Sequence, residues 1–403
     1  MQIISLNEIQ FKNYSRIHSK RNYFQTVEFA NVEKINGYNA LYVGMIDDNN
    51  NLVAASLILN KKIFSKYIYG NIPGGHLIDY DNYDLLNTYT NLLKKYLYKL
   101  NYVYIFINPL VPIKSTDKNN NILYENKNII NNINKTGYKK SQMLGITNSI
   151  NLNTNGNIKQ IFNNFSRFVK RNIKENKLMG IKITKSEDNG ISEFYSLIRK
   201  KTKYDIKYYE NYFNNFNSNY NLFEIYFANL NPHIYLENCN NILTKERKKN
   251  AKLTEKVLDL NVKSKNYYIN KKLHSDRLIE KYSKELQKAI KLNNIYKKDF
   301  VVATVAIIKN VDEIYFFVEG YEEEFRDIRA IHSITWDIIK KYSKLGYKKF
   351  NLGYTPQNKD KFKGIYFSKL GFNANIIEYP GNHFLVINNK IFNFLNMIEN
   401  KIK

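Results

Sequence analysis

The chain contains the same order of predicted elements twice, and this repeat restricts its fold more than any other sequence feature. Each copy begins with two apolar runs separated by a short polar turn, which is typical of a β-hairpin. A segment with apolar residues three and four apart follows and predicts a helix, and a third strand-like run comes directly after it. The runs are 40–46, 52–59, 84–100 and 102–107 in the first copy, and 300–308, 313–318, 328–345 and 348–352 in the second. The sequence therefore predicts an α/β (α+β) fold with two domains related by duplication.

A segment without glycine or proline runs from Asn238 to Asn294, ahead of the second set of strands. This composition favours long helices. Apolar residues recur three and four apart in two narrow seams flanked by charged residues, and Ser275–Asp276 supplies a helix cap between the seams. These patterns predict two antiparallel helices that form a projecting coiled-coil arm, with two ordinary core helices as the alternative.

Composition excludes several classes of protein. The 403 residues are 43% hydrophobic and 15% aromatic, so the chain is not mainly disordered and can form two or three domains. A single cysteine, Cys239, excludes an internal disulfide. No apolar run approaches the roughly 20 residues that cross a bilayer, and the first residues lack the pattern of a signal peptide. We therefore expect a cytoplasmic protein.

Basic side chains outnumber acidic ones by 62 to 36, which gives a net charge of +26. Such a charge favours nucleic acid, phosphorylated small molecules or an anionic membrane surface as a partner. The same lysine-rich composition is also typical of proteins from A/T-rich genomes. The charge is concentrated in two helical segments, which we interpret as phosphate-binding faces, with a solvated helix surface as the alternative. The candidates are Lys170, Arg171, Lys174, Lys245, Arg247, Lys248, Lys249 and Lys252.

Common catalytic motifs are missing from the sequence. It contains no phosphate-binding glycine loop, zinc-protease motif or serine-hydrolase motif. The six histidines lack the spacing of metal ligands, so we predict no metal site. There is also no pyrophosphate loop of the kind that acetyl-CoA-dependent enzymes carry, and no cofactor is predicted.

Five collinear stretches resemble motifs of the FemXAB family, the aminoacyl-tRNA-dependent aminoacyltransferases that build the cross-bridge of bacterial peptidoglycan. The stretches are 73–81, 165–181, 330–340, 351–353 and 364–372, and the resemblance extends from about Phe24 to Gly381. It implies two acetyltransferase-like (GNAT-like) domains with the arm inserted in the second. The implied division is 1–146 for the first domain, completed by 376–403, then 147–237 with 300–375 for the second domain and 238–299 for the arm.

The resemblance implies transfer of an amino acid from aminoacyl-tRNA to an amine of a peptidoglycan precursor, either nucleotide-linked or lipid-linked. The same class of enzymes includes immunity variants, which alter the cross-bridge so that a cell-wall endopeptidase no longer cleaves it. Because the ester of aminoacyl-tRNA is already activated, the reaction needs positioning and stabilisation of the oxyanion but no enzyme nucleophile. A buried ammonium group meets that need, and Lys369 corresponds to such a lysine in the family motif, so it is the catalytic candidate.

The remaining implied site residues bind substrates, and several depart from the family pattern. Ser368 replaces a phenylalanine, Asn108 replaces an aspartate, and the nucleotide-binding lysine falls next to Lys34. The complete set is Lys34, Asn108, Lys207, Tyr366 and Ser368. Two other functions stay open, namely an inactive RNA-binding protein of the same fold and an acyl-CoA-dependent N-acyltransferase. The positive charge also allows peripheral contact with the inner membrane face.

Overall fold

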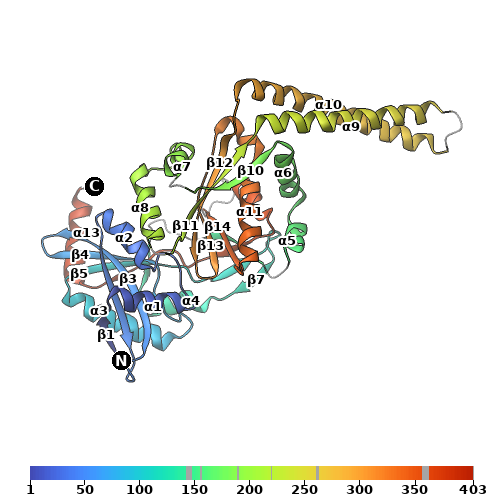
Figure 1. Cartoon of the computed structure of the whole chain (residues 1–403). Coiled ribbons are helices and arrows are strands. Elements are labelled where there is room, and N and C mark those ends of the chain that lie inside the picture. The colour runs from blue at the N-terminus through green and yellow to red at the C-terminus, as the bar shows by residue number, and fades with distance from the viewer. Residues whose placement is uncertain are drawn as a thin grey trace.

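Two β-sheets lie next to each other in the computed structural model, and a long helix pair extends from one of them (Figure 1). The structure describes residues 1–141, 148–154, 157–187, 190–218, 220–259, 263–355 and 363–402. Helices cover both sheets, so the predicted mixed α/β architecture is confirmed.

The first sheet has seven strands in the order β1-β2-β3-β4-β5-β16-β8. All neighbours are antiparallel except β4 and β5, which are parallel. The strands are β1 (Gln2–Ser5), β2 (Asn39–Ile46), β3 (Leu52–Phe64), β4 (Tyr67–Gly74), β5 (Tyr102–Pro109), β8 (Lys139–Lys140) and β16 (His383–Val386). The accompanying helices are α1 (Glu8–Ile17), α2 (Val27–Ile35), α3 (Tyr83–Lys99), α4 (Asn128–Lys135) and α13 (Asn389–Ile402).

The second sheet has nine strands in the order β10-β11-β12-β13-β14-β9-β15-β6-β7, and β13 and β14 are its parallel pair. The strands are β6 (Lys114–Thr116), β7 (Ile122–Glu125), β9 (Asn148–Asn153), β10 (Ile181–Lys185), β11 (Phe223–Leu230), β12 (Phe300–Asn310), β13 (Glu313–Tyr321), β14 (Lys349–Thr355) and β15 (Asn375–Glu378). Its helices are α5 (Ile158–Asn164), α6 (Arg167–Leu178), α7 (Ile191–Ile198), α8 (Ile206–Asn217), the 3₁₀ helix η1 (Glu323–Ile328), α11 (Ile331–Lys344) and α12 (Lys363–Leu370).

A repeat is present in both sheets, but its first copy is offset by one strand from the prediction. The predicted hairpin 40–46/52–59 corresponds to β2 and β3, whereas the hairpin equivalent to β12-β13 is β3-β4, and β4 was not predicted. An antiparallel hairpin, a helix and a parallel strand follow one another as β3-β4-α3-β5 and again as β12-β13-α11-β14. The two helices form because apolar side chains recur every three or four residues and one face of each packs on its sheet. The buried apolar residues are Leu86, Tyr89, Leu93 and Leu97 in α3, and Ile334, Ile338, Ile339 and Tyr342 in α11. The prediction of a duplicated domain is confirmed.

Two long helices form the extension visible in Figure 1 and pack against each other. They are α9 (Pro232–Leu258) and α10 (Lys265–Ile295). The predicted cap at Ser275–Asp276 is wrong, because both residues lie inside α10. Ser275 Oγ donates to Glu246 Oε1 at 2.7 Å, and Asp276 Oδ1 accepts from Asn250 Nδ2 at 2.8 Å. These polar side chains therefore connect α9 and α10 at a position where the sequence predicted the start of a helix.

The chain crosses between the two sheets more than once. Strands β6 and β7, from the first third of the chain, extend the second sheet, whereas β16 and α13, from its end, return to the first sheet. The predicted boundary at 146/147 lies outside the described residues, and the division into domains stays a prediction. No helix in the described ranges is long and apolar enough to cross a membrane.

Candidate functional site

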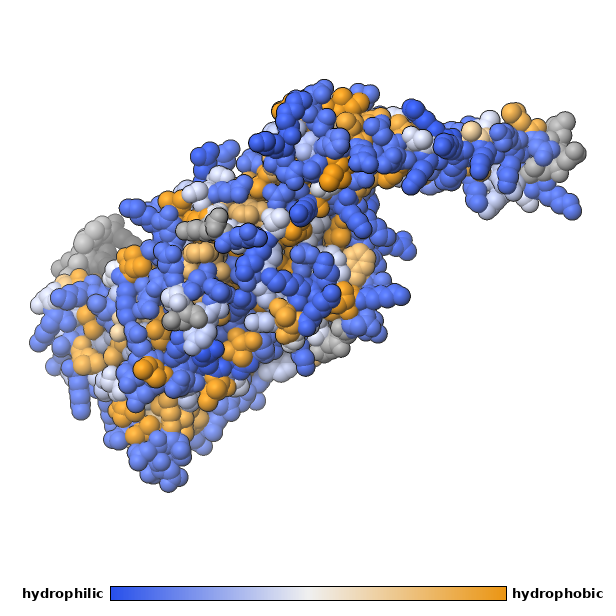
Figure 2. All heavy atoms as spheres, viewed as in Figure 1, coloured by the Kyte–Doolittle hydropathy of each residue, from blue (hydrophilic) through white to orange (hydrophobic). Residues whose placement is uncertain are grey.

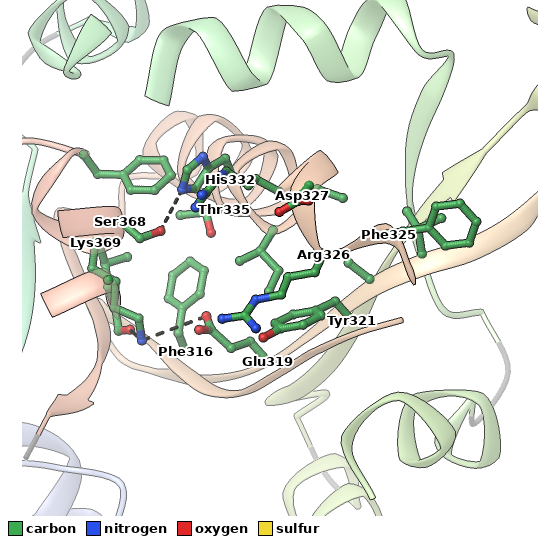
Figure 3. A pocket seen from close by; sticks show the side chains of 18 residues that line it. Phe316, Glu319, Tyr321, Phe325, Arg326, Asp327, His332, Thr335, Ser368 and Lys369 are labelled. Carbon is green, nitrogen blue, oxygen red and sulfur yellow. Dashed lines mark hydrogen bonds and ion pairs between the residues drawn. The ribbon is translucent and has the colours of Figure 1, made fainter. Parts of the chain in front are cut away.

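The parallel strands of the second sheet separate after a short paired stretch. Residues 313–315 of β13 pair with 349–351 of β14, and the remainder of each strand has no partner in the other. Side chains from η1, α11 and α12 surround the space that this separation leaves. It forms a cavity of about 420 Å³ (Figure 3). Its polar lining consists of Glu319, Tyr321, Arg326, Asp327, Arg329, His332, Thr335, Ser368 and Lys369.

A second cavity of about 200 Å³ adjoins the same two strands. Its walls are mainly aromatic, and Tyr23 from the first half of the chain contributes to them. The lining also includes Tyr315, Phe317, Asn351, Gly353 and Tyr354. Three residues, Phe316, Glu319 and Lys369, line both cavities. The Lys369 side chain is therefore accessible from the larger and from the smaller cavity.

The Lys369 ammonium group is held in place by two oxygen atoms. It donates to the carbonyl of Leu352, and its Nζ lies 3.9 Å from Glu319 Oε2. The side chain is only 16% exposed. A Cβ atom on Gly353 would lie 2.8 Å from Nζ, and the φ of +113° at this glycine is unfavourable for other residues. Gly353 thus gives the ammonium group room beside β14.

Arginine side chains add positive charge to the larger cavity. Figure 3 shows Arg326 pointing into it, toward Glu319 and Tyr321. The guanidinium carbon of Arg329 lies 4.9 Å from the centre of the Phe168 ring. Together with Lys369, these two arginines place three cationic groups against the carboxylates of Glu319 and Asp327, and this small excess of positive charge suits phosphate or a developing oxyanion.

Ser368 and His332 form a hydrogen bond on the wall of this cavity, between Oγ and Nε2 at 2.7 Å (Figure 3). Burial, together with the positive charge of Arg329, lowers the pKa of His332 to about 4. The imidazole is therefore neutral at physiological pH and acts as a hydrogen-bonding group rather than a cation.

Comparison with known proteins identifies the family. The FemAB family matches residues 6–400. The chain belongs to the FemAB family. Aminoacyltransferase FemA of Staphylococcus aureus strain bovine RF122 / ET3-1 is 24% identical over 428 residues, which cover 97% of both chains. The Staphylococcus epidermidis FemA is likewise 24% identical and covers 99% of both. A crystal structure of FemX superposes with a TM-score of 0.73 at 17% identity, covering 98% of this chain and 99% of that one.

Family membership confirms the resemblance seen in the sequence, and the class of enzyme is that of the aminoacyltransferases. Because the likeness to FemX is at low identity, it establishes the fold alone. The assignment of individual site residues in this FemAB protein rests on their positions in the structure.

Only part of the predicted site is brought together. Ser368 joins Lys369 in the larger cavity, and Tyr366 from the same helix is buried in the adjacent core. Asn108 is buried on β5 of the first sheet, opposite Pro73. The other two lysines lie on helices, Lys34 on α2 with its Nζ bonded to Glu8 and Asn31, and Lys207 in the first turn of α8. Asn108, Lys34 and Lys207 line neither cavity, and their roles stay predictions.

Sequence patterns did not indicate four residues of the site, namely Glu319, Arg326, Arg329 and His332. Glu319 lies on β13, but the predicted strand ended at residue 318, one position earlier. The two arginines belong to η1 and the residue after it, a charged segment that has no strand or helix periodicity. His332 lies within a recognised family stretch, although its isolation from other histidines concealed its partners.

The predicted RNA-binding residues lie on two helices. On α9, Lys245, Lys248, Lys249 and Lys252 surround an open groove beside Leu253, with Lys256 at its end. Arg247 is exposed on the same helix. Figure 2 shows a mainly hydrophilic surface along this part of the molecule. On α6, Arg171 and Lys174 are exposed, whereas Lys170 Nζ donates to the carbonyl of Asn163 at 2.9 Å.

Proposed function

We propose that this FemAB protein transfers an amino acid from aminoacyl-tRNA to an amine of a peptidoglycan precursor. Membership of the family and the name of its relatives, aminoacyltransferase FemA, support the class of reaction. The observation that carries the proposal is the position of Lys369, whose ammonium group lies between two cavities large enough for parts of two different substrates.

In this proposal the larger cavity takes the 3′ end of the charged tRNA. Arg326, Arg329 and Lys369 supply positive charge for the terminal phosphate and for the ester carbonyl. Once the amine attacks the ester carbon, the carbonyl oxygen becomes an oxyanion that Lys369 stabilises, and the bond to the ribose oxygen then breaks. After attack the nitrogen gives up a further proton, and the ribose oxygen leaves as a hydroxyl with that proton.

The smaller cavity takes the acceptor amine. Its aromatic side chains Tyr23, Tyr315 and Phe317 suit an alkyl ammonium group. The hydroxyl of Tyr354 is buried there without a hydrogen-bond partner among the described residues, so it offers an unused polar contact. Glu319, which faces both cavities, accepts the proton as the amine becomes nucleophilic.

The basic face of α9 binds the body of the tRNA. Its exposed lysines line an open groove, and lysine contacts phosphates without regard to sequence. The triple variant Lys248→Glu, Lys249→Glu and Lys252→Glu is expected to weaken tRNA binding and to reduce its salt dependence. If the affinity for tRNA and its salt dependence do not change, α9 is not part of the tRNA-binding surface. Its lysines would then form a solvated helix face or contact a membrane.

The test of the proposal is transfer in a purified system. The protein is mixed with tRNA charged with each labelled amino acid in turn, together with a nucleotide-linked or a lipid-linked precursor. Transfer to one precursor is expected, and the preferred form identifies the acceptor. Failure with every amino acid and both precursors would favour an RNA-binding protein of the same fold. Mass spectrometry of stem peptides from cells with and without the protein tests an immunity role, which predicts an altered cross-bridge.

A further inference from the structure

A hydrogen-bonded chain of three side chains leads from helix α6 to the wall of the larger cavity. Asn172 Nδ2 lies 3.0 Å from His332 Nδ1, and His332 Nε2 lies 2.7 Å from Ser368 Oγ. Asn172 and His332 are almost completely buried, whereas Ser368 faces the cavity. The three residues come from α6, α11 and α12, so the chain links the main helices around the site.

The imidazole of His332 is fixed in position by aromatic rings. The rings of Phe168 and Phe372 lie nearly perpendicular to the imidazole ring, with interplanar angles of 81° and 79°. Their centres are 5.7 Å and 5.6 Å from the centre of the imidazole. Among the described residues, its polar neighbours include Asn172, Ser368 and Arg329. Burial and the charge of Arg329 both keep the ring neutral.

The chain has a direction because the Asn172 NH₂ group can only donate. His332 Nδ1 therefore accepts, and in a neutral imidazole the proton then lies on Nε2. Nε2–H donates to Ser368 Oγ and occupies one of its lone pairs. Within the described residues Ser368 Oγ has no partner other than His332, so its own proton remains available to the cavity.

We propose that the Ser368 hydroxyl donates a second hydrogen bond to the oxyanion, next to Lys369, and that His332 and Asn172 orient it. This role rests on the proposed function. Ser368 is then a catalytic residue, since it touches the reacting oxygen, and the other two are positioning residues. A hydroxyl that already accepts from an imidazole N–H is a better donor, because hydrogen bonds in a chain polarise one another.

With the proton on Nε2, Ser368 cannot act as a nucleophile. Activation of a serine requires an imidazole nitrogen that accepts its proton, as in the hydrolase triad. In the proposed chain Nε2 carries a proton and donates it, so no base among the described residues is in contact with Oγ. The amino acid passes directly from the ribose oxygen to the amine, and no aminoacyl-enzyme forms.

Steady-state and single-turnover kinetics test the role of Ser368. Ser368→Ala is expected to lower kcat on the order of 10²-fold, as for other oxyanion donors, with KM for charged tRNA nearly unchanged. Ser368→Thr keeps the hydroxyl and is expected to restore most of the loss. Ser333→Ala is the matched control, because it removes a comparable hydrogen bond between α6 and α11, from Asn176 to Ser333, outside the cavity. It should retain wild-type kcat.

The ring nitrogens of His332 provide a readout that does not depend on catalysis. In protein with ¹⁵N-labelled histidine, the signals of His332 are assigned by their loss in His332→Gln. Their chemical shifts are expected to place the proton on Nε2. Asn172→Asp replaces the donor by a carboxylate that accepts from Nδ1–H, so it should move the proton to Nδ1 and lower kcat about as much as Ser368→Ala.

The outcomes separate this inference from the proposed function. If the wild type transfers an amino acid while Ser368→Ala keeps its kcat, the role of Ser368 is wrong and the proposed function stands. A proton on Nδ1 in the wild type would overturn the direction of the chain, whatever the activity. An aminoacyl adduct on Ser368, found by mass spectrometry after incubation with charged tRNA alone, would overturn it in favour of a covalent route. Absence of transfer by the wild type would refute both.

Discussion

Replacing Lys369 by methionine removes the ammonium group that faces both cavities and keeps most of the side-chain volume. In the folded chain this group lies 3.9 Å from the Glu319 carboxylate, and its side chain is 16% exposed. Two unit charges about 4 Å apart interact by about 4 kcal/mol at an effective dielectric constant of about 20. An oxyanion bound at a similar distance would lose about that amount, which corresponds to roughly a 10³-fold decrease in kcat.

The assay is a single-turnover measurement with pre-charged tRNA and excess precursor, following the labelled amino acid. Lys340→Met is the matched control, because Lys340 lies on α11, is 41% exposed and pairs with Asp337. Such exposed pairs contribute at most about 1 kcal/mol to stability. The control should therefore keep its fold and its rate. Circular dichroism of both variants separates loss of rate from loss of structure.

A folded Lys369→Met variant with a rate within about threefold of the wild type would refute the reasoning. The other informative result is weaker tRNA binding with an unchanged rate at saturating tRNA. In that case Lys369 would bind the donor equally in the ground state and the transition state and would not accelerate the reaction.

Two further predictions concern the surroundings of the site. Gly353→Ala places a Cβ 2.8 Å from Lys369 Nζ at a φ of +113°, so it should displace the ammonium group, lower kcat and cost about 1–3 kcal/mol in unfolding free energy. Single-turnover kinetics and denaturant unfolding check both effects, and an unchanged rate would contradict the placement of Nζ. Burial raises the pKa of Glu313 from 4.5 to about 7, so the folded state holds this proton more tightly than the unfolded chain and loses stability as pH rises through that window. Glu313→Gln should therefore be more stable than the wild type, by an amount on the order of 2–3 kcal/mol at pH 7 and near zero below pH 4.5. Denaturant unfolding at several pH values measures this difference in unfolding free energy. A difference that does not change with pH would refute the prediction. The pKa of the neighbouring Asp312 is lowered from 3.8, so this carboxyl group titrates outside that pH window.

Much of the fold could be predicted from local patterns. The predicted helix 84–100 corresponds to α3 at Tyr83–Lys99, and the strands at 300–308 and 313–318 correspond to β12 and β13. These predictions succeed because burial on one face imposes a period of 3.6 or 2 on the sequence itself. The repeat was visible for the same reason, since both copies must bury equivalent faces.

Polar residues with more than one structural use could not be assigned from the sequence. Ser275 and Asp276 have the composition of a helix cap, yet they bond across the helix pair to Glu246 and Asn250. A side-chain oxygen suits both a free backbone N–H and a partner on the next helix, and only the fold decides between them. His332 is a similar case, because its partners Asn172 and Ser368 are 160 and 36 residues away in the chain.

The position of the site in one copy of the repeat also depends on tertiary contacts. In the first copy, β4 pairs with β5 along its length, up to Gly74 opposite Pro109. A Cβ on the next glycine, Gly75, would lie 2.7 Å from the Pro109 backbone, so the glycines let these strands stay close. In the second copy the pairing of β13 with β14 stops at Tyr315, and Lys369 reaches the opened space from α12. Duplication therefore yields one closed pair that supports the fold and one open pair that can hold substrates.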